Sequence, residues 1–494
     1  MNPIRSRILF LVASLVFAMG AARAAGPNFG QHYPPEKSSY VDPVTHLTVD
    51  VLTTDKIDDA KPYQTHTTWT ADGKWIIFRS SRGGNGPQIF LLNEQSGDIV
   101  QVTDTPGTGT GSLNLSRKEM KLYYMRGGAQ GFGRGGAATA SATPPPRQLI
   151  ETNIGALLTD SLAGKVKDAT TYERVVATLP ADLRDSGGFA LDADESKAYW
   201  GVSTGPQGNP ANAGRRAGAP AAAPVAEAAP AAGASTTGAT MPGSTRQMGR
   251  AIDQPNMDPN VSRDSNRIRW EVQGRGQGGI RSIDLKTGEI KTVIDVNFRM
   301  GHVQTNPWVP GEIVYCHETT GDAPQRMWFV KGDGTGNRPL YKEDPEGWEW
   351  ITHETFATKD EVMFLIIGHL PYLRERPTGV AVINLRNNRM NIVGQIDENI
   401  APDRPGGFWH CNGSSDGRWA VADTFKGDVY LIDRHSSEIT LLTTDHKMTP
   451  DHAHPIFSPD NKRVLIQSGR LTDGASLDLM SITLPDSLVN RRKP

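Results

Sequence analysis

Three histidines in the C-terminal part of the chain have the types and spacing of a metal site. His452 and His454 are two positions apart, and residues two apart on a β-strand point to the same side. His410, from an earlier part of the chain, adds a third imidazole. Divalent metals bind neutral imidazole readily, and three histidines with open positions are typical of a catalytic metal. The alternative is that these histidines are hydrogen-bonded side chains where strands begin.

A second group combines a guanidinium with imidazole and carboxylate side chains. Arg326 can bind a carboxylate through two parallel hydrogen bonds. His353, which precedes Glu354, and His317, which precedes Glu318, are candidate bases near neutral pH. A metal, an arginine and a neutral base are what β-elimination from a uronic acid requires, because the proton removed lies next to a carboxylate whose charge must be neutralised. The alternatives are an inter-blade salt bridge for Arg326 and a structural hydrogen bond for His353.

One short pattern recurs along the chain and indicates the elements that would position these residues. A polar lead-in, an acidic or glycine turn and a basic residue precede an alternating apolar strand, as in Thr70-Ala71-Asp72-Gly73-Lys74. Repeats of several short strands that cannot bury both sheet faces alone are typical of a propeller. The pattern therefore predicts an all-β, seven-bladed β-propeller. The expected strands are residues 75–78, 122–124, 198–200, 313–315, 362–364, 419–421 and 464–466.

The propeller pattern also predicts how the ring closes and where the histidines lie. Residues 44–52 look like a strand that completes the last sheet, so that no sheet edge stays open. His302, His353, His410 and the His452–His454 pair all fall at or just before the first strand of a blade. First strands line the centre of the ring, so we expect these histidines to converge near the axis.

Three segments lie outside the repeats. Residues 1–24 have two arginines, a short apolar run and an Ala22-Arg23-Ala24 cleavage site, which predicts a signal peptide and a periplasmic or secreted protein. The propeller is expected over residues 40–494. Residues 127–146 and 205–264 are rich in Gly, Ala and Pro and are predicted to be disordered insertions, the second one within the third blade.

Composition excludes several other classes of protein. A net charge of −2 and a pI near 6.6 argue against a nucleic-acid partner. No stretch approaches the roughly 20 apolar residues of a membrane-spanning helix. Cys316 and Cys411 are the two cysteines, and each stands beside a histidine. They could form one disulfide, although two buried free thiols are the simpler expectation.

The sequence resembles the oligogalacturonate lyases, most specifically over residues 300–470. The matching motifs are Gly301-His302, Val314-Tyr315-Cys316-His317-Glu318, Gln325-Arg326-Met327-Trp328-Phe329, Thr352-His353-Glu354-Thr355-Phe356, His410 with Asn412, and His452-Ala453-His454-Pro455. The resemblance implies a seven-bladed propeller that cleaves short, acidic galacturonide oligosaccharides with a divalent, manganese-type ion. It further implies that His410, His452 and His454 bind the metal. His353 would be the base, and Arg326 would neutralise the substrate carboxylate.

The chain also departs from that family. Thr449 stands where the family usually has a glutamine ligand, so coordination could be completed by water, by His446 or by nothing. The export signal departs from the family's cytoplasmic members. The alternative function is a non-catalytic, TolB-like periplasmic propeller that binds proteins. A prolyl-peptidase-like hydrolase is excluded, because no G-x-S-x-G motif and no hydrolase domain follow the repeats.

Overall fold

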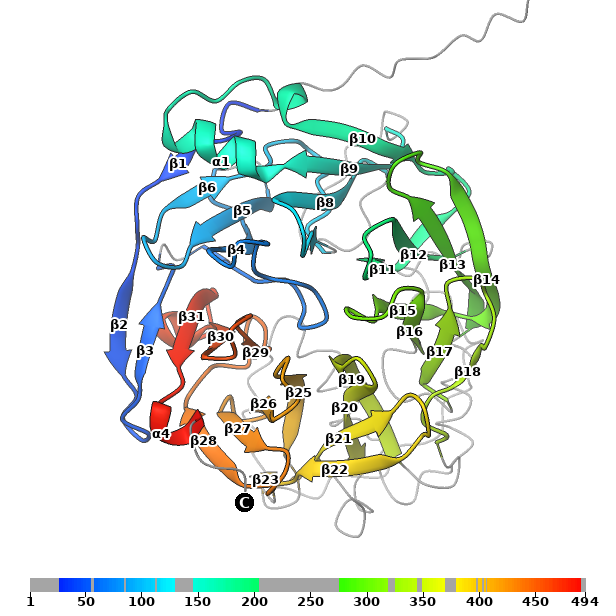
Figure 1. The fold of residues 1–494 in the computed structure, drawn as a ribbon. Helices are drawn as coiled ribbons and strands as arrows, with labels where there is room; N and C mark the ends of the chain where they lie inside the picture. Colours follow the sequence, from blue (N-terminus) through cyan, green and yellow to red (C-terminus); the bar gives the residue numbers. More distant parts are fainter. Residues whose placement is uncertain are drawn as a thin grey trace, which may run out of the picture.

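The computed structural model contains seven β-sheets arranged as the blades of one ring (Figure 1). It describes residues 26–54, 57–83, 86–111, 113–128, 145–203, 275–318, 325–343, 349–368, 379–396, 399–401, 404–405 and 407–489. The predicted signal peptide, most of the two predicted insertions and the last five residues lie outside these ranges. The all-β, seven-bladed propeller predicted from the repeats is confirmed.

Six blades follow one another along the chain, and in each of them neighbouring strands pair antiparallel. From the outer edge inward, the first is β1 (His32–Tyr33), β6 (Ile99–Gln101), β5 (Gln88–Asn93) and β4 (Trp75–Ser80), and the second is β10 (Glu173–Thr178), β9 (Gln148–Asn153), β8 (Lys121–Arg126) and β7 (Asn114–Leu115). From the axis outward, the third is β11 (Arg184–Leu191), β12 (Lys197–Ser203), β13 (Arg275–Asp284) and β14 (Ile290–Phe298).

The remaining blades keep the order from the axis outward. The fourth is β15 (Met300–Thr305), β16 (Glu312–His317), β17 (Met327–Lys331) and β18 (Arg338–Pro339), and the fifth is β19 (Glu349–Thr358), β20 (Glu361–Gly368), β21 (Gly379–Asn384) and β22 (Met390–Gly394). The sixth is β25 (Phe408–Gly413), β26 (Trp419–Thr424), β27 (Val429–Asp433) and β28 (Ile439–Thr443). The hairpin of β23 (Asn399–Ala401) and β24 (Arg404–Pro405) precedes it.

The seventh blade joins the two ends of the described chain. From the axis outward it contains β29 (Ile456–Phe457), β30 (Arg463–Ser468), β31 (Asp478–Thr483), β3 (Thr48–Val51) and β2 (Ser38–Val41). Val49 pairs with Ile482, so the N-terminal strand closes the ring as predicted. Because β1 already belongs to the first blade, strands of the propeller begin at His32, ahead of the predicted start at residue 40.

The apolar strands that follow the repeated turns are β4, β8, β12, β16, β20, β26 and β30. β4 is the innermost strand of the first blade, and each of the other six is the second strand from the axis. Four residues of the first repeat, Trp75 to Phe78, are buried. The long predicted insertion connects β12 to β13, whose adjacent ends pair through Ser203 and Gly278. This agrees with its expected position inside the third blade.

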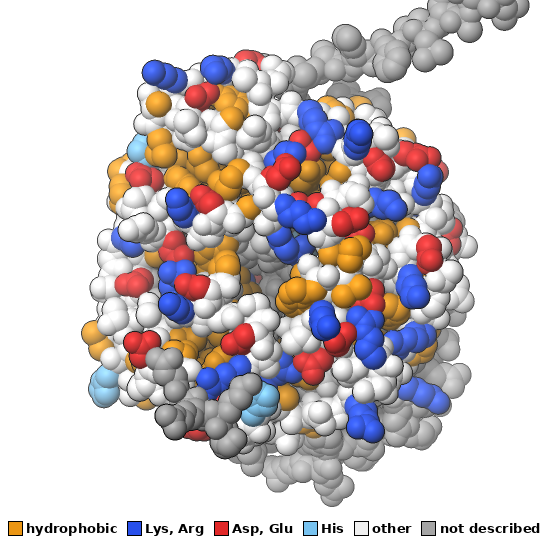
Figure 2. All heavy atoms as spheres, viewed as in Figure 1, with side chains coloured by type: hydrophobic (Ala, Val, Ile, Leu, Met, Phe, Trp, Pro, Cys, Tyr) orange, Lys and Arg blue, Asp and Glu red, His pale blue; other side chains and the backbone are white. Residues whose placement is uncertain are grey.

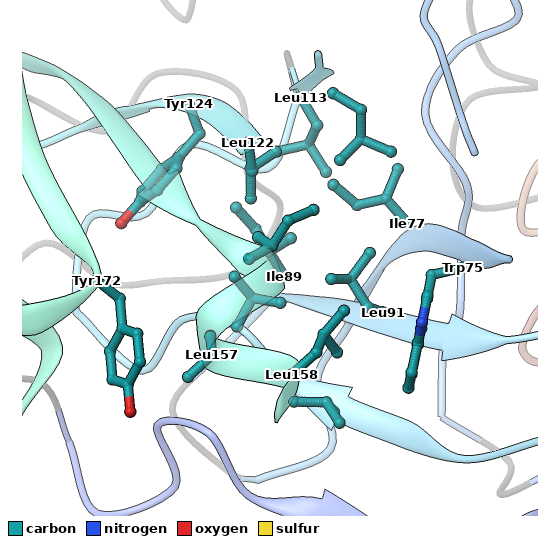
Figure 3. Packing of buried hydrophobic residues seen from close by; sticks show 14 of the residues in the cluster. Trp75, Ile77, Ile89, Leu91, Leu113, Leu122, Tyr124, Leu157, Leu158 and Tyr172 are labelled. Carbon is teal, nitrogen blue, oxygen red and sulfur yellow. The ribbon is translucent and has the colours of Figure 1, made fainter. Parts of the chain in front are cut away.

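Apolar side chains from neighbouring blades form the cores between them. Figure 3 shows one such core, in which Ile77, Leu91 and Trp75 of the first blade face Leu122 and Tyr124 of the second. The helix α1 (Ile154–Leu162) packs Leu157 and Leu158 onto the same cluster, and Asn153 caps its N-terminus by accepting from the Ala156 amide. Within the described ranges the other helix is α4 (Asp486–Val489), and the 3-10 turns are η1 (Ala169–Thr171) and η4 (Arg470–Thr472). Among the described helices, none has the length and apolar character needed to cross a bilayer.

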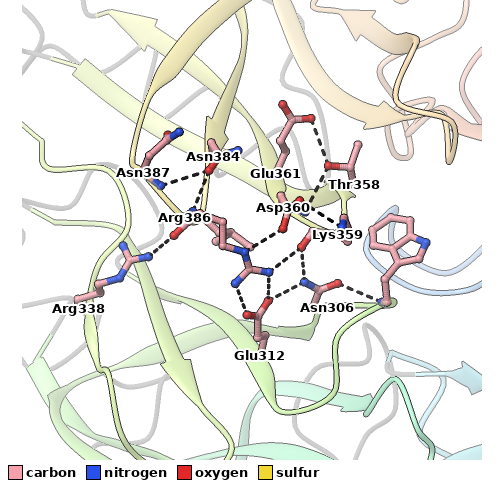
Figure 4. A network of polar contacts seen from close by, with 12 residues as sticks. Asn306, Glu312, Arg338, Thr358, Lys359, Asp360, Glu361, Asn384, Arg386 and Asn387 are labelled. Atoms are coloured by element: carbon pink, nitrogen blue, oxygen red, sulfur yellow. Dashed lines mark hydrogen bonds and ion pairs between the residues drawn. The ribbon is translucent and has the colours of Figure 1, made fainter.

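Polar networks also connect neighbouring blades. In Figure 4, Arg386, after β21 in the fifth blade, bonds the carboxylates of Asp360 at 2.8 Å and of Glu312 in the fourth blade. The Asn306 amide donates to the same Glu312 carboxylate at 2.7 Å. On the face seen in Figure 2, cationic and anionic side chains are interspersed. The charges therefore stabilise contacts between blades and leave no stripe of one sign on that face.

Candidate functional site

The first strands of four consecutive blades bring five histidines together near the axis. His302 comes from β15, His353 from β19 and His410 from β25, while His452 and His454 lie just before β29. The ring centre of His410 lies 4.2 Å from that of His353, 3.8 Å from that of His454 and 5.2 Å from that of His452. The histidines that the sequence placed at equivalent positions of the blades thus form one cluster.

Three of these histidines share an unusual backbone conformation. His302, His353 and His454 have φ values of 48°, 57° and 46°. These left-handed values are uncommon for residues other than glycine and are found at functional sites. In β15 and β19 the pairing register shifts around the histidine, which is the signature of a β-bulge. A bulge re-aims one side chain out of the regular alternation, and here it does so at the same place in two blades.

His452 and His454 do not lie on a regular strand. Both precede β29, which begins at Ile456, and His454 has left-handed backbone. The expectation that both histidines lie on a strand was therefore wrong, although both rings lie near that of His410. Their ring centres are 6.1 Å apart, and their planes are nearly perpendicular at 85°.

One group of side chains has the donor atoms and spacing of a metal site. The ligand atoms of His410, Asp423 and His452 all lie within 4.8 Å of one another, and all three residues are buried. Asp423 of β26 contacts Nδ1 of His410 at 3.1 Å and accepts from the backbone amides of His410 and His454 at 2.7 and 3.0 Å. A carboxylate that orients an imidazole through its second nitrogen is the usual partner of a metal-binding histidine.

The state of His452 gives an independent test of that group. Neither of its ring nitrogens has a hydrogen-bond partner among the described residues, although the side chain is buried. Buried polar atoms are rarely left unpaired, because the lost hydration costs about 1–3 kcal/mol. Burial also lowers the pKa of His452 to about 4, which keeps its imidazole neutral and able to donate a lone pair. These residues therefore fit a divalent cation.

His454 lies against this group but has other partners. Its Nδ1 is 2.9 Å from Oε1 of Gln64, and its Nε2 is 3.3 Å from the carboxylate of Asp451. Both nitrogens are thus engaged by protein atoms in this arrangement. A metal bound by His454 would have to replace Asp451 at Nε2, while Gln64 would continue to fix the orientation of the ring.

Three other predicted side chains lie apart from the donor group. The Thr449 hydroxyl packs against Gly474. Both ring nitrogens of His446 face hydroxyls, Nδ1 that of Ser468 at 2.7 Å and Nε2 that of Thr443 at 3.1 Å, so His446 is not a fourth ligand here. The His317 ring packs on Phe298, with ring centres 4.6 Å apart, and Phe298 in turn packs on Trp328.

Arg326 lies beside the histidine cluster between two carboxylates. Its Nε is 3.4 Å from Glu354 and a terminal nitrogen is 3.9 Å from Glu318. Burial lowers the pKa of Arg326, but the surrounding acidic groups outweigh burial and hold that pKa well above its usual value. Cys316, which is free and buried like Cys411, forms a second group of possible ligands with His302 and Glu318. The positively charged guanidinium of Arg326 already lies next to Glu318 of this second group.

His353 is linked to a segment that sequence reasoning did not select. The Tyr63 hydroxyl lies 2.5 Å from Nδ1 of His353. The ring of Tyr63 makes edge contacts with His302, His410 and His454, with ring centres 5.4, 6.2 and 5.3 Å apart. Burial, and then the neighbouring His410 and Arg326, lower the pKa of His353 well below its ordinary value. Tyr63 thus stands at the middle of the cluster.

The same segment supplies two more groups. Gln64 bonds His454, and the buried Lys61 has its ammonium 3.2 Å from the carbonyl of Pro62. Burial lowers the pKa of Lys61 to about 7, against the opposing effect of Asp451 and Asp423. The available sequence signal was the gathering of Lys61, Tyr63, Gln64 and His66 directly ahead of the first blade's repeat.

The chain is similar to known proteins in part of its sequence and in its fold. No protein-family model matches the sequence. The chain is 28% identical over 228 residues to an oligogalacturonide lyase of Pectobacterium atrosepticum, covering 42% of this chain and 56% of that one. It is 27% identical over 230 residues to an oligogalacturonate lyase of Dickeya dadantii, covering 42% and 55%. The matched part thus spans little more than half the length of these curated relatives.

Two solved structures share the whole architecture. An oligogalacturonate lyase in complex with manganese superposes with a TM-score of 0.64 at 19% identity. The oligogalacturonate lyase of Vibrio parahaemolyticus gives 0.63 at 17% identity. Each match covers 93% of this chain and 99% of the other. At these identities the likeness establishes the seven-bladed fold, while the sequence matches support the resemblance to oligogalacturonate lyases.

Proposed function

We propose that this protein is a metal-dependent polysaccharide lyase that cleaves short uronic-acid oligosaccharides, such as oligogalacturonides, by β-elimination. The observation that carries the proposal is the buried group of His410, Asp423 and His452, placed beside His353 and Arg326. The His452 imidazole in this group has no hydrogen-bond partner among the described residues. The sequence similarity to two oligogalacturonide lyases supports this substrate class. The manganese in a structural neighbour supports a manganese-type ion.

β-Elimination requires a positive charge that neutralises the substrate carboxylate and a base that removes the C5 proton. The proton at C5 of a uronic acid is adjacent to a carboxylate, whose negative charge opposes the formation of a carbanion. A bound divalent metal, held by His410, His452 and Asp423 or His454, would supply positive charge at that carboxylate. Arg326 supplies further positive charge, and its ion pairs with Glu354 and Glu318 keep the guanidinium in place. His353 takes the proton, because burial keeps its imidazole neutral at working pH.

The location of the protein is part of the same proposal. Residues 1–24 have the composition of a signal peptide, which would place the mature protein in the periplasm or outside the cell. There it would act on small acidic oligosaccharides that come from a larger polymer.

The test is the appearance of a 4,5-unsaturated uronide, which absorbs in the ultraviolet. Purified protein is mixed with di- and trigalacturonate, first with Mn²⁺ and then with a chelator. We expect the absorbance to grow with metal and to stop with chelator. His353→Gln should abolish turnover while leaving the fold and bound metal unchanged, and His317→Gln is the matched control that should retain activity.

Two outcomes would overturn parts of the proposal. A flat trace with galacturonides and with other uronides, from protein that also binds no Mn²⁺, would remove the lyase assignment. Full activity of His353→Gln would remove only the role of His353.

A further inference from the structure

We infer that Tyr63 is a catalytic residue that relays the substrate proton to His353. The inference rests on the proposed lyase function and deepens it, because it names the atom that meets the substrate. It follows from the way the two nitrogens of His353 are surrounded.

One side of the His353 ring is closed to substrate. Its Nε2 is buried and has no hydrogen-bond partner among the described residues. The rings of Trp409 and His410 pack against His353 with ring centres 4.5 and 4.2 Å away. A sugar ring therefore has no path to Nε2, and any proton that His353 receives must arrive at Nδ1.

Among the described residues, Nδ1 of His353 faces the hydroxyl of Tyr63. The Tyr63 hydroxyl lies 2.5 Å from Nδ1, within the usual range for a strong hydrogen bond. Both Tyr63 and His353 retain some exposure to solvent, whereas His410 and His452 are buried. Substrate approaching Nδ1 therefore meets the phenol oxygen first.

Tyr63 also lies between the two cationic groups that would bind a carboxylate. Its ring contacts His302, which is 3.5 Å from Glu318 and so adjoins the Arg326 ion pairs. On the other side it contacts His454 and His410, next to the candidate metal donors. A uronate held between these groups would have its reacting carbon near the phenol.

The relay is balanced in atoms and charge. The phenol O–H proton moves to Nδ1 of His353 as the phenol oxygen takes the C5 proton of the substrate. The electron pair of the C5–H bond forms the C4–C5 double bond, and the C4–O4 bond breaks. Water protonates the departing O4. The hydroxide that forms takes the phenol proton of Tyr63, while the His353 imidazolium returns its Nδ1 proton to the phenol oxygen.

Tyr63→Phe tests the relay because it keeps the ring contacts and removes only the hydroxyl. We expect kcat to fall by about 10²–10⁴-fold, the usual contribution of a proton-transfer group, with KM and Mn²⁺ affinity nearly unchanged. The isotope effect with C5-deuterated substrate should rise in the variant, since proton transfer becomes slower than the other steps. Tyr315→Phe, which removes a 2.7 Å hydrogen bond to Asn337 away from the cluster, is the matched control and should retain activity.

A second measurement needs no substrate. The proton shared by Tyr63 and His353 should give a far-downfield ¹H resonance that disappears in both Tyr63→Phe and His353→Gln. Absence of this resonance in the wild-type protein would overturn the relay whatever the activity. An active wild type with a fully active Tyr63→Phe would also overturn the relay but leave the lyase function standing. An inactive wild type that shows the resonance would overturn the lyase function while leaving the Tyr63–His353 pair established.

Discussion

The Tyr63 hydroxyl lies 2.5 Å from Nδ1 of His353, although 290 positions separate the two residues. Tyr63 belongs to the segment between the closing strand β3 and the first full blade, whereas His353 lies in the fifth blade. The ring closure therefore does more than remove an open sheet edge. It places the N-terminal segment against histidines contributed by four later blades.

Gln64 is expected to control metal affinity through His454. Its Oε1 lies 2.9 Å from Nδ1 of His454 and fixes the ring orientation. Gln64→Leu should weaken Mn²⁺ binding by about 10–100-fold, the usual effect of removing a residue that orients a ligand. Isothermal titration calorimetry measures the change. The matched control is Gln88→Leu, a buried glutamine of the first blade that bonds Thr103, and equal affinities in the two variants would exclude this role.

His452 is expected to be needed for metal but not for folding. Because its buried nitrogens have no protein partner, His452→Ala removes no hydrogen bond from the described structure. Mn²⁺ at 100 times its Kd should stabilise the wild type by about 2.7 kcal/mol and the variant not at all. Thermal unfolding with and without Mn²⁺ measures this. His446→Gln should keep the metal-dependent rise in Tm, and a variant His452→Ala that still responds to Mn²⁺ would contradict the assignment.

His446 is expected to make the fold sensitive to acid. Burial, followed by the charge of Arg470, lowers its pKa from 6.5 to about 4. Between these values the unfolded chain binds a proton that the folded chain does not, so stability rises with pH across that window. The shifted pKa of His446 should therefore lower the free energy of unfolding by on the order of 3 kcal/mol as the pH falls from above 6.5 to below 4.

Urea denaturation at several pH values measures this effect. His446→Gln should flatten the pH dependence of the unfolding free energy between pH 6.5 and 4, although other histidines whose pKa is lowered to about 4, such as His66, will leave part of it. Gln88→Leu, which removes a buried polar side chain that carries no titratable group, is the control and should leave the slope unchanged. An unaltered slope in His446→Gln would show that His446 is not responsible.

The closing strand is expected to carry a large share of stability. Val49 of β3 is fully buried in the core that joins it to β31 and β30. Val49→Asp should cost several kcal/mol, because it places a charge where no partner is available. Val41→Asp, on the neighbouring β2 but 60% exposed, should change stability by less than about 0.5 kcal/mol. Equal unfolding free energies of Val49→Asp and Val41→Asp, measured in urea, would mean that the closing strand does not stabilise the fold.

The sequence alone determined the propeller and the blades that carry the site. A turn of acidic or glycine residues followed by alternating apolar residues is a local property, so each copy specifies one strand wherever it occurs. The number of copies, the closing strand at residues 44–52 and the histidines at equivalent strand starts followed from this repetition. The resemblance to oligogalacturonate lyases followed from motifs that lie within single blades.

Only the tertiary structure decided which side chains meet. Asp423 and Gln64 contact His410 and His454 across different strands or blades, and no local pattern records such distances. His454 has left-handed backbone and lies ahead of β29, so strand alternation does not set the direction of its side chain. A single bulge or turn redirects a side chain without altering the spacing of residues. The polar residues around Tyr63 were a sequence signal, but they could not show that Tyr63 meets His353, since ring closure, a property of the whole chain, brings the two together.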